Sequence, residues 1–195
     1  MIIDGVILAG GQSSRMGQDK ALLTRDHRDM FFYTLDSLQE LPLNQIFISR
    51  NPSQISYLTR LQVVPDQYQN LGPLSGIYSV AQHTNADAIL VVPIDLPLLE
   101  PRDLKKIMSM ASDPSHDGEQ PIYFEDNYLP ILLPLTDNVR DYLSDVVSGR
   151  IKTRSVKALC RQFNGIEISP DDIDRLQNTN TPEQWLAAKL ELMEI

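Results

Sequence analysis

The chain opens with the stretch IDGVILAGGQSSRMGQDK, from Ile3 to Lys20, and this stretch indicates the kind of fold to expect. Its first six residues form a mostly apolar run that leads directly into glycines, a pattern typical of a buried parallel strand. Gly10 and Gly11 lack side chains, so their backbone N–H groups can approach phosphate oxygens. The sequence therefore predicts a strand that ends in a phosphate-binding loop, although two glycines also suit an ordinary tight turn.

The rest of this loop contains side chains suited to nucleotidyl transfer. In that reaction an acceptor oxygen attacks the α-phosphorus of a nucleotide while pyrophosphate leaves, so negative charge builds up on oxygen atoms. Arg15 and Lys20, together with a divalent metal, can stabilise this charge. The spacing of the loop matches neither a P-loop nor a dinucleotide-binding fingerprint.

Further apolar runs recur along the first half of the chain, at residues 45–48, 62–64 and 88–92. The segments between them are long enough for helices, and residues 31–41 have the apolar spacing of a helix. Alternation of this kind favours a parallel sheet covered on both faces. We therefore expect an α/β protein with a three-layer αβα, Rossmann-like nucleotidyltransferase fold and a mostly parallel central sheet.

The second half of the chain has a different pattern. Residues 121–124 and 128–133 resemble a pair of strands joined by a turn, and residues 139–147 resemble a helix. Thr181 as N-cap, followed by a proline and a glutamate, predicts a last helix over residues 182–192. No linker or repeat interrupts the sequence, so we expect a single domain that spans residues 1–195.

Composition excludes several classes of protein. The chain has 195 residues, 42% of them apolar, which is enough for one sizeable core. Cys160 is the only cysteine, so no disulfide forms within the chain, and we expect it to fill the core. A net charge of -9 argues against binding to nucleic acid or an anionic membrane. No apolar run approaches the roughly 18–20 residues of a membrane span, and no secretory signal is evident, so we expect a cytoplasmic protein.

The full string LAGGQSSRMGQDKALL resembles the signature of small nucleotidyltransferases, and most closely that of the MobA-like molybdenum cofactor guanylyltransferases. Four further segments match in order, namely the region of Asp66, GPLSG at 72–76, PIDLP at 93–97 and NTNTP at 178–182. The resemblance implies transfer of GMP from Mg-GTP to the terminal phosphate of molybdopterin, with release of pyrophosphate and a requirement for Mg²⁺. It implies GTP and molybdopterin as binding partners, besides proteins that deliver molybdopterin or mature molybdoenzymes.

Asp95 is the candidate metal ligand. It follows the apolar run at 88–92, which places it at the carboxyl edge of a parallel sheet, where ligands of such folds bind. Mg²⁺ prefers carboxylate oxygens and is usually held by one or two carboxylates plus phosphates. The alternative is that Asp95 caps a helix or turn. The family often has a cysteine before this aspartate where the present chain has Ile94, which leaves the assignment of Asp95 intact.

The resemblance also implies which residues hold the nucleotide. From the sequence alone, Asp66 could lie beside the nucleotide or form a turn, and Asn51, just before Pro52, would be regarded as an ordinary turn residue. GPLSG could support the base, or simply start a helix. The predicted nucleotide-binding residues are Leu8, Ala9, Gly10, Gly11, Lys20, Asn51, Asp66 and Asp95, and the predicted catalytic residues are Arg15, Lys20 and Asp95.

The acceptor is expected on the C-terminal side of the molecule. Residues 149–163, the basic segment, read GRIKTRSVKALCRQF, with five basic residues and no acidic one in a strongly negative chain. Such a segment is either an anion site, with Arg154 as its predicted acceptor-binding residue, or a solvated helix face. Asn178 and Asn180 match family asparagines near the acceptor, where their amides could pair with the pterin; Asn180 could also be a simple turn residue.

Two other functions remain open from the sequence. A related enzyme could use CTP, or a sugar or alditol phosphate as acceptor, because the residues that read the base are not identified by a motif. The chain could instead be a nucleotide-binding sensor without catalysis. Residues 24–29, TRDHRD, depart from the short glycine-and-proline turn of the family, which is the feature that favours an altered function.

Overall fold

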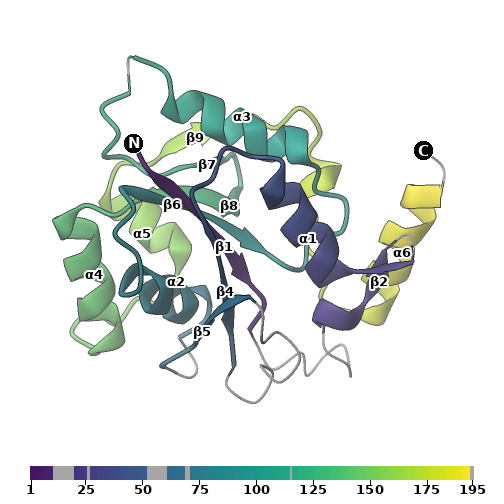
Figure 1. The fold of residues 1–195 in the computed structure, drawn as a ribbon, viewed down its shortest axis with the longest axis horizontal. Helices are drawn as coiled ribbons and strands as arrows, with labels where there is room; N and C mark the ends of the chain where they lie inside the picture. The colour runs from purple at the N-terminus through teal and green to yellow at the C-terminus, as the bar shows by residue number, and fades with distance from the viewer. Residues whose placement is uncertain (11–19, 26, 52–60, 69–70, 115, 194–195) are drawn as a thin grey trace.

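The computed structural model describes residues 1–10, 20–25, 27–51, 61–68, 71–114 and 116–193, and it contains a seven-stranded sheet between two layers of helices (Figure 1). The strands of this sheet are β1 (Ile3–Leu8), β4 (Ile46–Arg50), β5 (Gln62–Pro65), β6 (Ala88–Pro93), β7 (Ile122–Phe124), β8 (Asn127–Pro134) and β9 (Ile166–Ile168). Their order across the sheet is β5-β4-β1-β6-β8-β7-β9. The predicted three-layer fold with a mostly parallel sheet is confirmed.

The strand β1 lies at the centre of the parallel part of the sheet. It pairs in parallel with β4 on one side, where Val6 faces Phe47, and with β6 on the other, where Val6 faces Val91. β5 continues the parallel arrangement beyond β4, whereas β8 runs antiparallel to both β6 and β7. Strands β5, β4, β1 and β6 therefore all end at one edge of the sheet.

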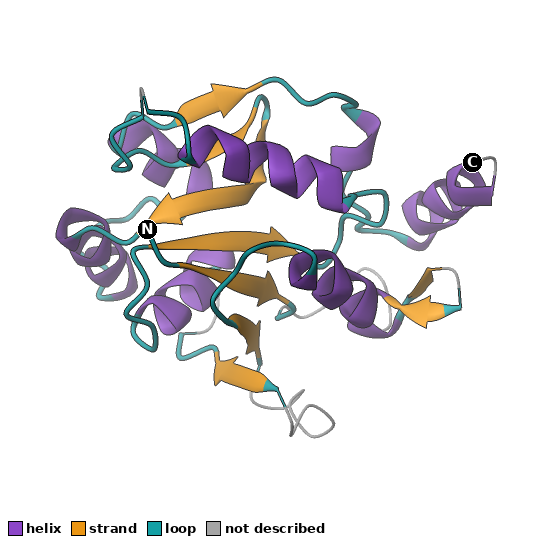
Figure 2. Cartoon of the chain, turned by 45° about the horizontal axis from the view of Figure 1, so that its top comes forward, coloured by secondary structure: helices purple, strands orange, loops and turns teal. Residues whose placement is uncertain are grey.

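Helices cover both faces because successive residues of the central strands point to opposite sides. Ile7 packs in the same apolar cluster as α1 (Met30–Gln39) and α3 (Pro101–Ala111). Its neighbour Val6 packs instead with α2 (Pro73–Ala81), α4 (Asp137–Val147) and α5 (Val156–Gln162). Figure 2 shows the helices on either side of the strands. Val6 and Ile7 are both fully buried, as expected for a strand between two layers.

Several of these helices begin at glycine, proline or capping residues. Gly72, with φ of 61°, immediately precedes α2, and Pro73 occupies the first helical turn, where its missing N–H costs nothing. Glu100 and Asp103 form a reciprocal capping box at the start of α3. Thr136 caps α4 by accepting a hydrogen bond from the Val139 N–H at 3.3 Å. Each of these helices thus begins at residues that cap the backbone N–H groups of its first turn or, at proline, remove one of them.

The predicted elements are found close to their expected bounds. The helix expected at residues 31–41 is α1, and the last helix is α6 (Pro182–Met193), which lies at one side of the molecule in Figures 1 and 2. The structure adds a small hairpin, β2 (Thr24–Arg25) and β3 (Arg28–Asp29), which the sequence did not predict. It also adds β9, the helix α3 and the short helix α5, none of which was predicted. Strands of two or three residues are too short to leave a periodic pattern.

Cys160 lies in α5 and is fully buried in the apolar cluster of that face. Burial raises the pKa of its thiol to about 12, so the side chain stays protonated. The prediction that Cys160 fills the core is confirmed. In the described part of the chain, no helix is both long enough and apolar enough to cross a membrane.

Candidate active site

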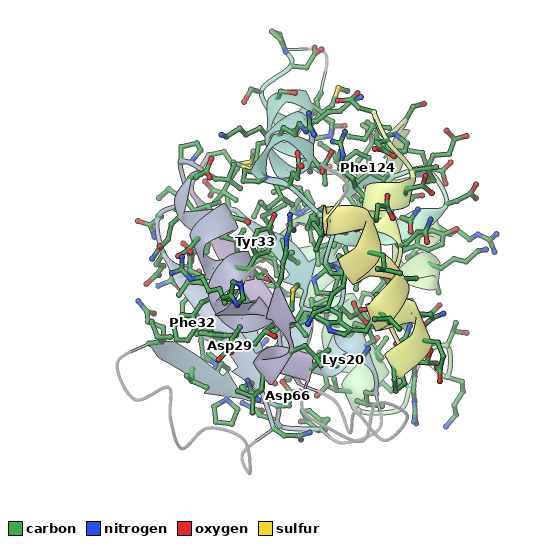
Figure 3. All side chains as sticks on the ribbon, turned by 90° about the vertical axis from the view of Figure 1, so that its right-hand side faces the viewer. Lys20, Asp29, Phe32, Tyr33, Asp66 and Phe124 are labelled. Carbon is green, nitrogen blue, oxygen red and sulfur yellow. The ribbon has the colours of Figure 1, made fainter. Side chains whose placement is uncertain are left out.

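The four parallel strands end at the same edge of the sheet, and predicted nucleotide-binding residues follow each of them. Ala9 and Gly10 follow β1, Asn51 follows β4, Asp66 follows β5, and Asp95 lies two residues beyond β6. Figure 3 shows Lys20 and Asp66 at the end of the molecule to which these strands run. Ligands of open α/β sheets bind at this edge, and the predicted residues therefore gather where such a ligand would lie.

Gly10 and Asp66 lie against each other across the end of β4. A Cβ atom built on Gly10 would stand 2.5 Å from Oδ2 of Asp66, so any larger residue would displace the carboxylate. Ser49, at the end of β4, donates a hydrogen bond from its hydroxyl to Oδ1 of Asp66. Burial raises the pKa of Asp66, and the hydrogen bond from Ser49 opposes this shift in part. A partly buried carboxylate with a raised pKa at a ligand-binding edge is a candidate functional group.

Ser49 was not predicted as a site residue. No motif marks it, because it lies inside an apolar strand and its partner is seventeen residues further along the chain. The pairing of β4 with both β1 and β5 brings the two side chains together. The backbone continues this arrangement past the strands, with hydrogen bonds from Ala9 N–H to Ser49 C=O and from Asp66 N–H to Arg50 C=O, both 2.9 Å.

Three residues predicted from distant parts of the sequence meet in one cluster. The Nζ atom of Lys20 lies 3.0 Å from Oδ2 of Asp95 and 2.8 Å from Oδ1 of Asn180. The side chains of Lys20 and Asp95 are 16% and 20% exposed, so their ion pair is partly shielded from water. The cluster joins the loop after β1, the loop after β6 and the segment before α6. It combines a cation, a carboxylate and an amide at the carboxyl edge.

Asp95 is held through its backbone as well as its side chain. Its carbonyl oxygen accepts hydrogen bonds from the N–H of Thr179 at 2.9 Å and from the hydroxyl of Thr179 at 3.3 Å. The next residue back, Ile94, donates its N–H to the Leu8 carbonyl at 3.2 Å and so ties the loop to the end of β1. Thr179 is buried, and unlike its neighbours Asn178 and Asn180 it was not predicted as a site residue.

The carboxylate of Asp95 suits a divalent cation. Its Oδ1 atom is buried and has no hydrogen-bond partner among the described residues, whereas Oδ2 accepts from Lys20. A buried carboxylate oxygen without a hydrogen-bond partner fits a hard metal ion such as Mg²⁺. Within the ranges that the structure describes, no three or more His, Cys, Asp or Glu side chains cluster in a way that could enclose a metal. Phosphate oxygens would therefore complete the ligand set.

Other predicted site residues lie outside this cluster. Gly11 and Arg15 fall outside the described residues. Asn51 is partly buried at the end of β4, and Asn178 is exposed. The GPLSG segment begins α2, as its helix-starting interpretation predicted, and Gly76 packs against Leu8 and Ser49 so closely that a Cβ there would collide with both side chains. A role for this segment near the base stays a prediction.

The basic segment reaches the same edge from the C-terminal side. β8 runs antiparallel to β6, so its first residues, including Tyr128, lie beside the end of β6. Lys157 Nζ lies 5.4 Å from the centre of the Tyr128 ring. Arg150 forms an ion pair of 2.6 Å with Asp145, and the exposed Arg154 has no carboxylate partner in the described part of the chain. The segment thus places positive charge beside the start of β8, and its proximity to the acceptor stays a prediction.

Comparison with known proteins agrees with this geometry. The family model for the MobA-like NTP transferase domain matches residues 5–163. A molybdenum cofactor guanylyltransferase from Xanthomonas euvesicatoria is 35% identical over 184 residues, which are 93% of this chain and 91% of the relative. Another from Shewanella baltica is 32% identical over 194 residues, or 97% of each chain.

Solved structures show the same fold at lower identity. The molybdopterin-guanine dinucleotide biosynthesis protein A of Archaeoglobus fulgidus superposes with a TM-score of 0.78 and 16% identity, covering 98% of this chain and all of that one. A cytidylyltransferase from Thermus thermophilus, which acts on 2-C-methyl-D-erythritol 4-phosphate, gives a TM-score of 0.71 with 10% identity over 99% of this chain and all of that one. At such identities the likeness concerns the fold alone. The family model and the more similar relatives, by contrast, extend over most of the sequence, and the chain belongs to the MobA-like NTP transferase family.

Proposed function

We propose that this protein is a molybdenum cofactor guanylyltransferase, which transfers GMP from Mg-GTP to the terminal phosphate of molybdopterin and releases pyrophosphate. The observation that carries the proposal is the cluster of Lys20, Asp95 and Asn180 at the carboxyl edge of the sheet. Support also comes from the relatives with that name, which match this chain over more than nine-tenths of its length. The neighbours that use CTP are only 10–11% identical, so they do not favour the alternative.

The N-terminal part of the chain would bind the nucleotide. Leu8, Ala9, Gly10 and Gly11 offer backbone groups to it directly after β1, and Asn51 and Asp66 lie at the ends of the adjoining strands. The close contact between Gly10 and Asp66 supports this arrangement, because the absence of a side chain at Gly10 lets the Asp66 carboxylate lie against the backbone at the end of β1. Arg15 and Lys20 would offset the charge of the phosphates.

The metal would be held by Asp95. Mg²⁺, when bound there with the nucleotide, supplies positive charge to the phosphate oxygens and so favours departure of pyrophosphate. The chain itself holds the carboxylate in place through Thr179 and Lys20. Lys20 would contact the same phosphates, with its ammonium group oriented by the hydrogen bond to Asn180. Catalysis would consist mainly of positioning and electrostatic stabilisation, with no covalent enzyme intermediate.

The C-terminal part of the chain would bind the acceptor. Arg154 in the basic segment would attract the acceptor phosphate, and Asn178 and Asn180 would orient the pterin. Asn180 contacts Lys20, so it would join the acceptor side of the site to the nucleotide side. Because GTP is supplied in the cytoplasm, we place the reaction there, together with proteins that deliver molybdopterin and receive the product.

A direct assay tests the proposal. Purified protein with Mg²⁺, GTP and molybdopterin should yield pyrophosphate and a product whose mass equals molybdopterin plus GMP. Calorimetric titration with GTP, CTP, ATP and UTP in the presence of Mg²⁺ should show the tightest binding for GTP. A clear preference for CTP would overturn the substrate assignment. Binding of GTP with no pyrophosphate release in the presence of acceptor would instead favour a sensor.

A further inference from the structure

Arg25 is a buried arginine within residues 24–29, the segment in which this chain departs from its family. It belongs to β2 and is 8% exposed. Arginine is rarely buried unless its guanidinium group is well paired, because taking an unpaired charge out of water is costly. Its Nη1 atom donates hydrogen bonds to the carbonyl oxygens of Pro97 and Leu99, the latter at 3.5 Å. Both acceptors lie just after Asp95.

Tyr33 supports this contact from α1. The guanidinium carbon of Arg25 lies 3.8 Å from the centre of the Tyr33 ring, in cation–π geometry. The hydroxyl of Tyr33 donates a hydrogen bond of 2.8 Å to the carbonyl of Leu99, an acceptor it shares with Arg25. Burial raises the pKa of Tyr33, so its hydroxyl keeps the proton that this bond requires. Figure 3 shows Tyr33 on the ribbon of α1.

The segment that these two residues hold is the Asp95 loop, residues 95–99. The segment of residues 20–25 therefore contacts the loop twice, through Lys20 on the Asp95 side chain at 3.0 Å and through Arg25 on the loop backbone. Thr179 holds the loop at the Asp95 carbonyl. Movement of the loop would shift the buried Oδ1 atom of Asp95, which is the oxygen without a hydrogen-bond partner in the described ranges.

We infer that Arg25, resting on Tyr33, is a positioning residue that sets where the Asp95 carboxylate meets the divalent metal. The inference rests on the proposed function only in requiring a metal at Asp95, and it is independent of which base or acceptor is used. The guanidinium group donates to two carbonyls of the same loop, a pairing that a lysine ammonium reproduces only in part. Partners of this kind orient metal ligands, and their removal typically weakens metal binding about 10-fold to 100-fold.

Mn²⁺ is the probe for this inference. Free Mn²⁺ is measured by electron paramagnetic resonance as the metal is titrated into the full-length protein with GTP. We expect Arg25→Met to weaken Mn²⁺ binding by roughly 10-fold, with the KM for GTP changed by less than about 2-fold because Lys20 and the glycine loop are intact. The kcat should fall at low Mg²⁺ and recover as Mg²⁺ is raised. Arg25→Lys should restore part of the metal affinity.

Tyr33→Phe is the second variant, because it keeps the ring beneath Arg25 and removes the hydroxyl that donates to Leu99. We expect it to fold normally and to weaken Mn²⁺ binding in the same direction by a smaller factor. Arg28→Met is the matched control, since Arg28 lies in the same hairpin but pairs with Asp36 at the surface. It should leave Mn²⁺ binding unchanged.

Unchanged Mn²⁺ binding in folded Arg25→Met and Tyr33→Phe would overturn the inference. The inference would also be overturned if the variants lost GTP affinity and Tm to an extent that explains all of their weaker Mn²⁺ binding. That outcome would indicate a purely structural role for Arg25. If the wild-type protein makes no product from GTP and molybdopterin, the proposed function fails, yet the Mn²⁺ comparison still stands with whichever nucleoside triphosphate the protein binds.

Discussion

The two carboxylate oxygens of Asp95 lie in different surroundings. Oδ2 accepts a hydrogen bond from Lys20, whereas Oδ1 is buried without a hydrogen-bond partner in the part of the chain that the structure describes. An unpaired buried acceptor costs about 1–3 kcal/mol, and a bound cation removes that cost. One oxygen of the side chain is thus held by the protein, and under the proposed function the other would bind the metal.

Replacing Asp95 by asparagine separates these two roles. The amide side chain keeps an oxygen that can accept from Lys20, but it carries no negative charge for Mg²⁺. We expect kcat for pyrophosphate release to fall by roughly 10³-fold, while GTP binding without metal, measured by calorimetry, is retained. Asp145→Asn, which removes a surface carboxylate paired with Arg150, should have no effect. Full activity of the Asp95→Asn enzyme at ordinary Mg²⁺ would rule out metal ligation by this residue.

The negative charge of Asp66 lowers the stability of the folded protein. Burial raises its pKa in the folded protein above the ordinary value of 3.8, so the folded state binds the proton more tightly than the unfolded state. The folded protein therefore loses stability as pH rises from that value through the raised pKa. We expect Asp66→Asn to have a higher Tm than the wild type at pH 7.5, and the difference to shrink as pH falls towards 4.

Under the proposed function, the Asp66 carboxylate lowers the stability of the folded protein but is needed to bind the nucleotide. Asp66→Asn should weaken GTP binding even as it raises Tm, a trade-off typical of functional residues. Thermal unfolding of both proteins across pH 4–8 isolates the effect, because the other titrating groups cancel in the difference. A variant less stable than the wild type at neutral pH would show that the Ser49–Asp66 hydrogen bond outweighs the cost of burying the charge.

At the scale of elements, the segment that carries Asn178 to Asn180 is anchored to a helix on the same side of the sheet. Arg175, in the 3-10 helix η3 (Asp174–Leu176), lies 2.9 Å from Oδ1 of Asp103 near the start of α3. Asp103 is 3% exposed, and burial raises its pKa even though Arg175 favours the charged form. This ion pair fixes the path of the chain just before it reaches Thr179 and the Asp95 loop.

Arg175→Ala should therefore destabilise the protein by about 3 kcal/mol at pH 7, because it leaves a buried carboxylate without its cation. Urea unfolding measures the change, and the loss should diminish at low pH, where Asp103 is protonated. Lys105→Ala is the control, since the Lys105–Glu40 pair is about half exposed and is worth less than about 1 kcal/mol. Equal effects of the two substitutions would refute the anchoring role.

The central strands and several helices were predictable from sequence because each is marked locally. β1 and β6 are apolar runs and α2 begins with glycine and proline, whereas α3 was not predicted although it begins with a proline and a capping box. The helix α5 has apolar residues at helical spacing, namely Val156, Leu159 and Cys160. It was not predicted, because this segment was interpreted by its positive charge. The hairpin of β2 and β3 left no pattern, because two-residue strands are too short to show one.

The candidate site was predicted only where a motif marks it. Lys20, Asp95 and Asn180 lie in three recognisable motifs, and the structure brings them together. Ser49 and Arg25 were missed because each acts through a partner distant in sequence. Such contacts depend on which strands become neighbours, and residue type and spacing do not determine that.

For the molecule as a whole, the distribution of charge matters more than its sum. The chain carries a net charge of -9, yet the basic segment presents cations beside the carboxyl edge of the sheet. An anionic acceptor is repelled by the protein at long range and attracted by this segment at short range. Salt screens both effects over about 8–10 Å, so their balance should depend on ionic strength.

We expect the combined substitution of Arg154 and Lys157 by glutamine to raise the KM for molybdopterin by roughly 30-fold at low salt, since each contact between a cation and a phosphate is worth about 1 kcal/mol. The KM for GTP should be almost unchanged, because Lys20 and the loop after β1 are untouched. Raising the salt concentration should increase the wild-type KM for the acceptor and have less effect on the variant, so the two values should converge. The combined substitution of Lys105 and Lys106 by glutamine removes two cations from the surface of α3 and controls for the change in net charge. An equal loss of affinity for GTP and acceptor, or a salt dependence that the two substitutions leave intact, would show that the acceptor phosphate binds elsewhere on the edge of the sheet.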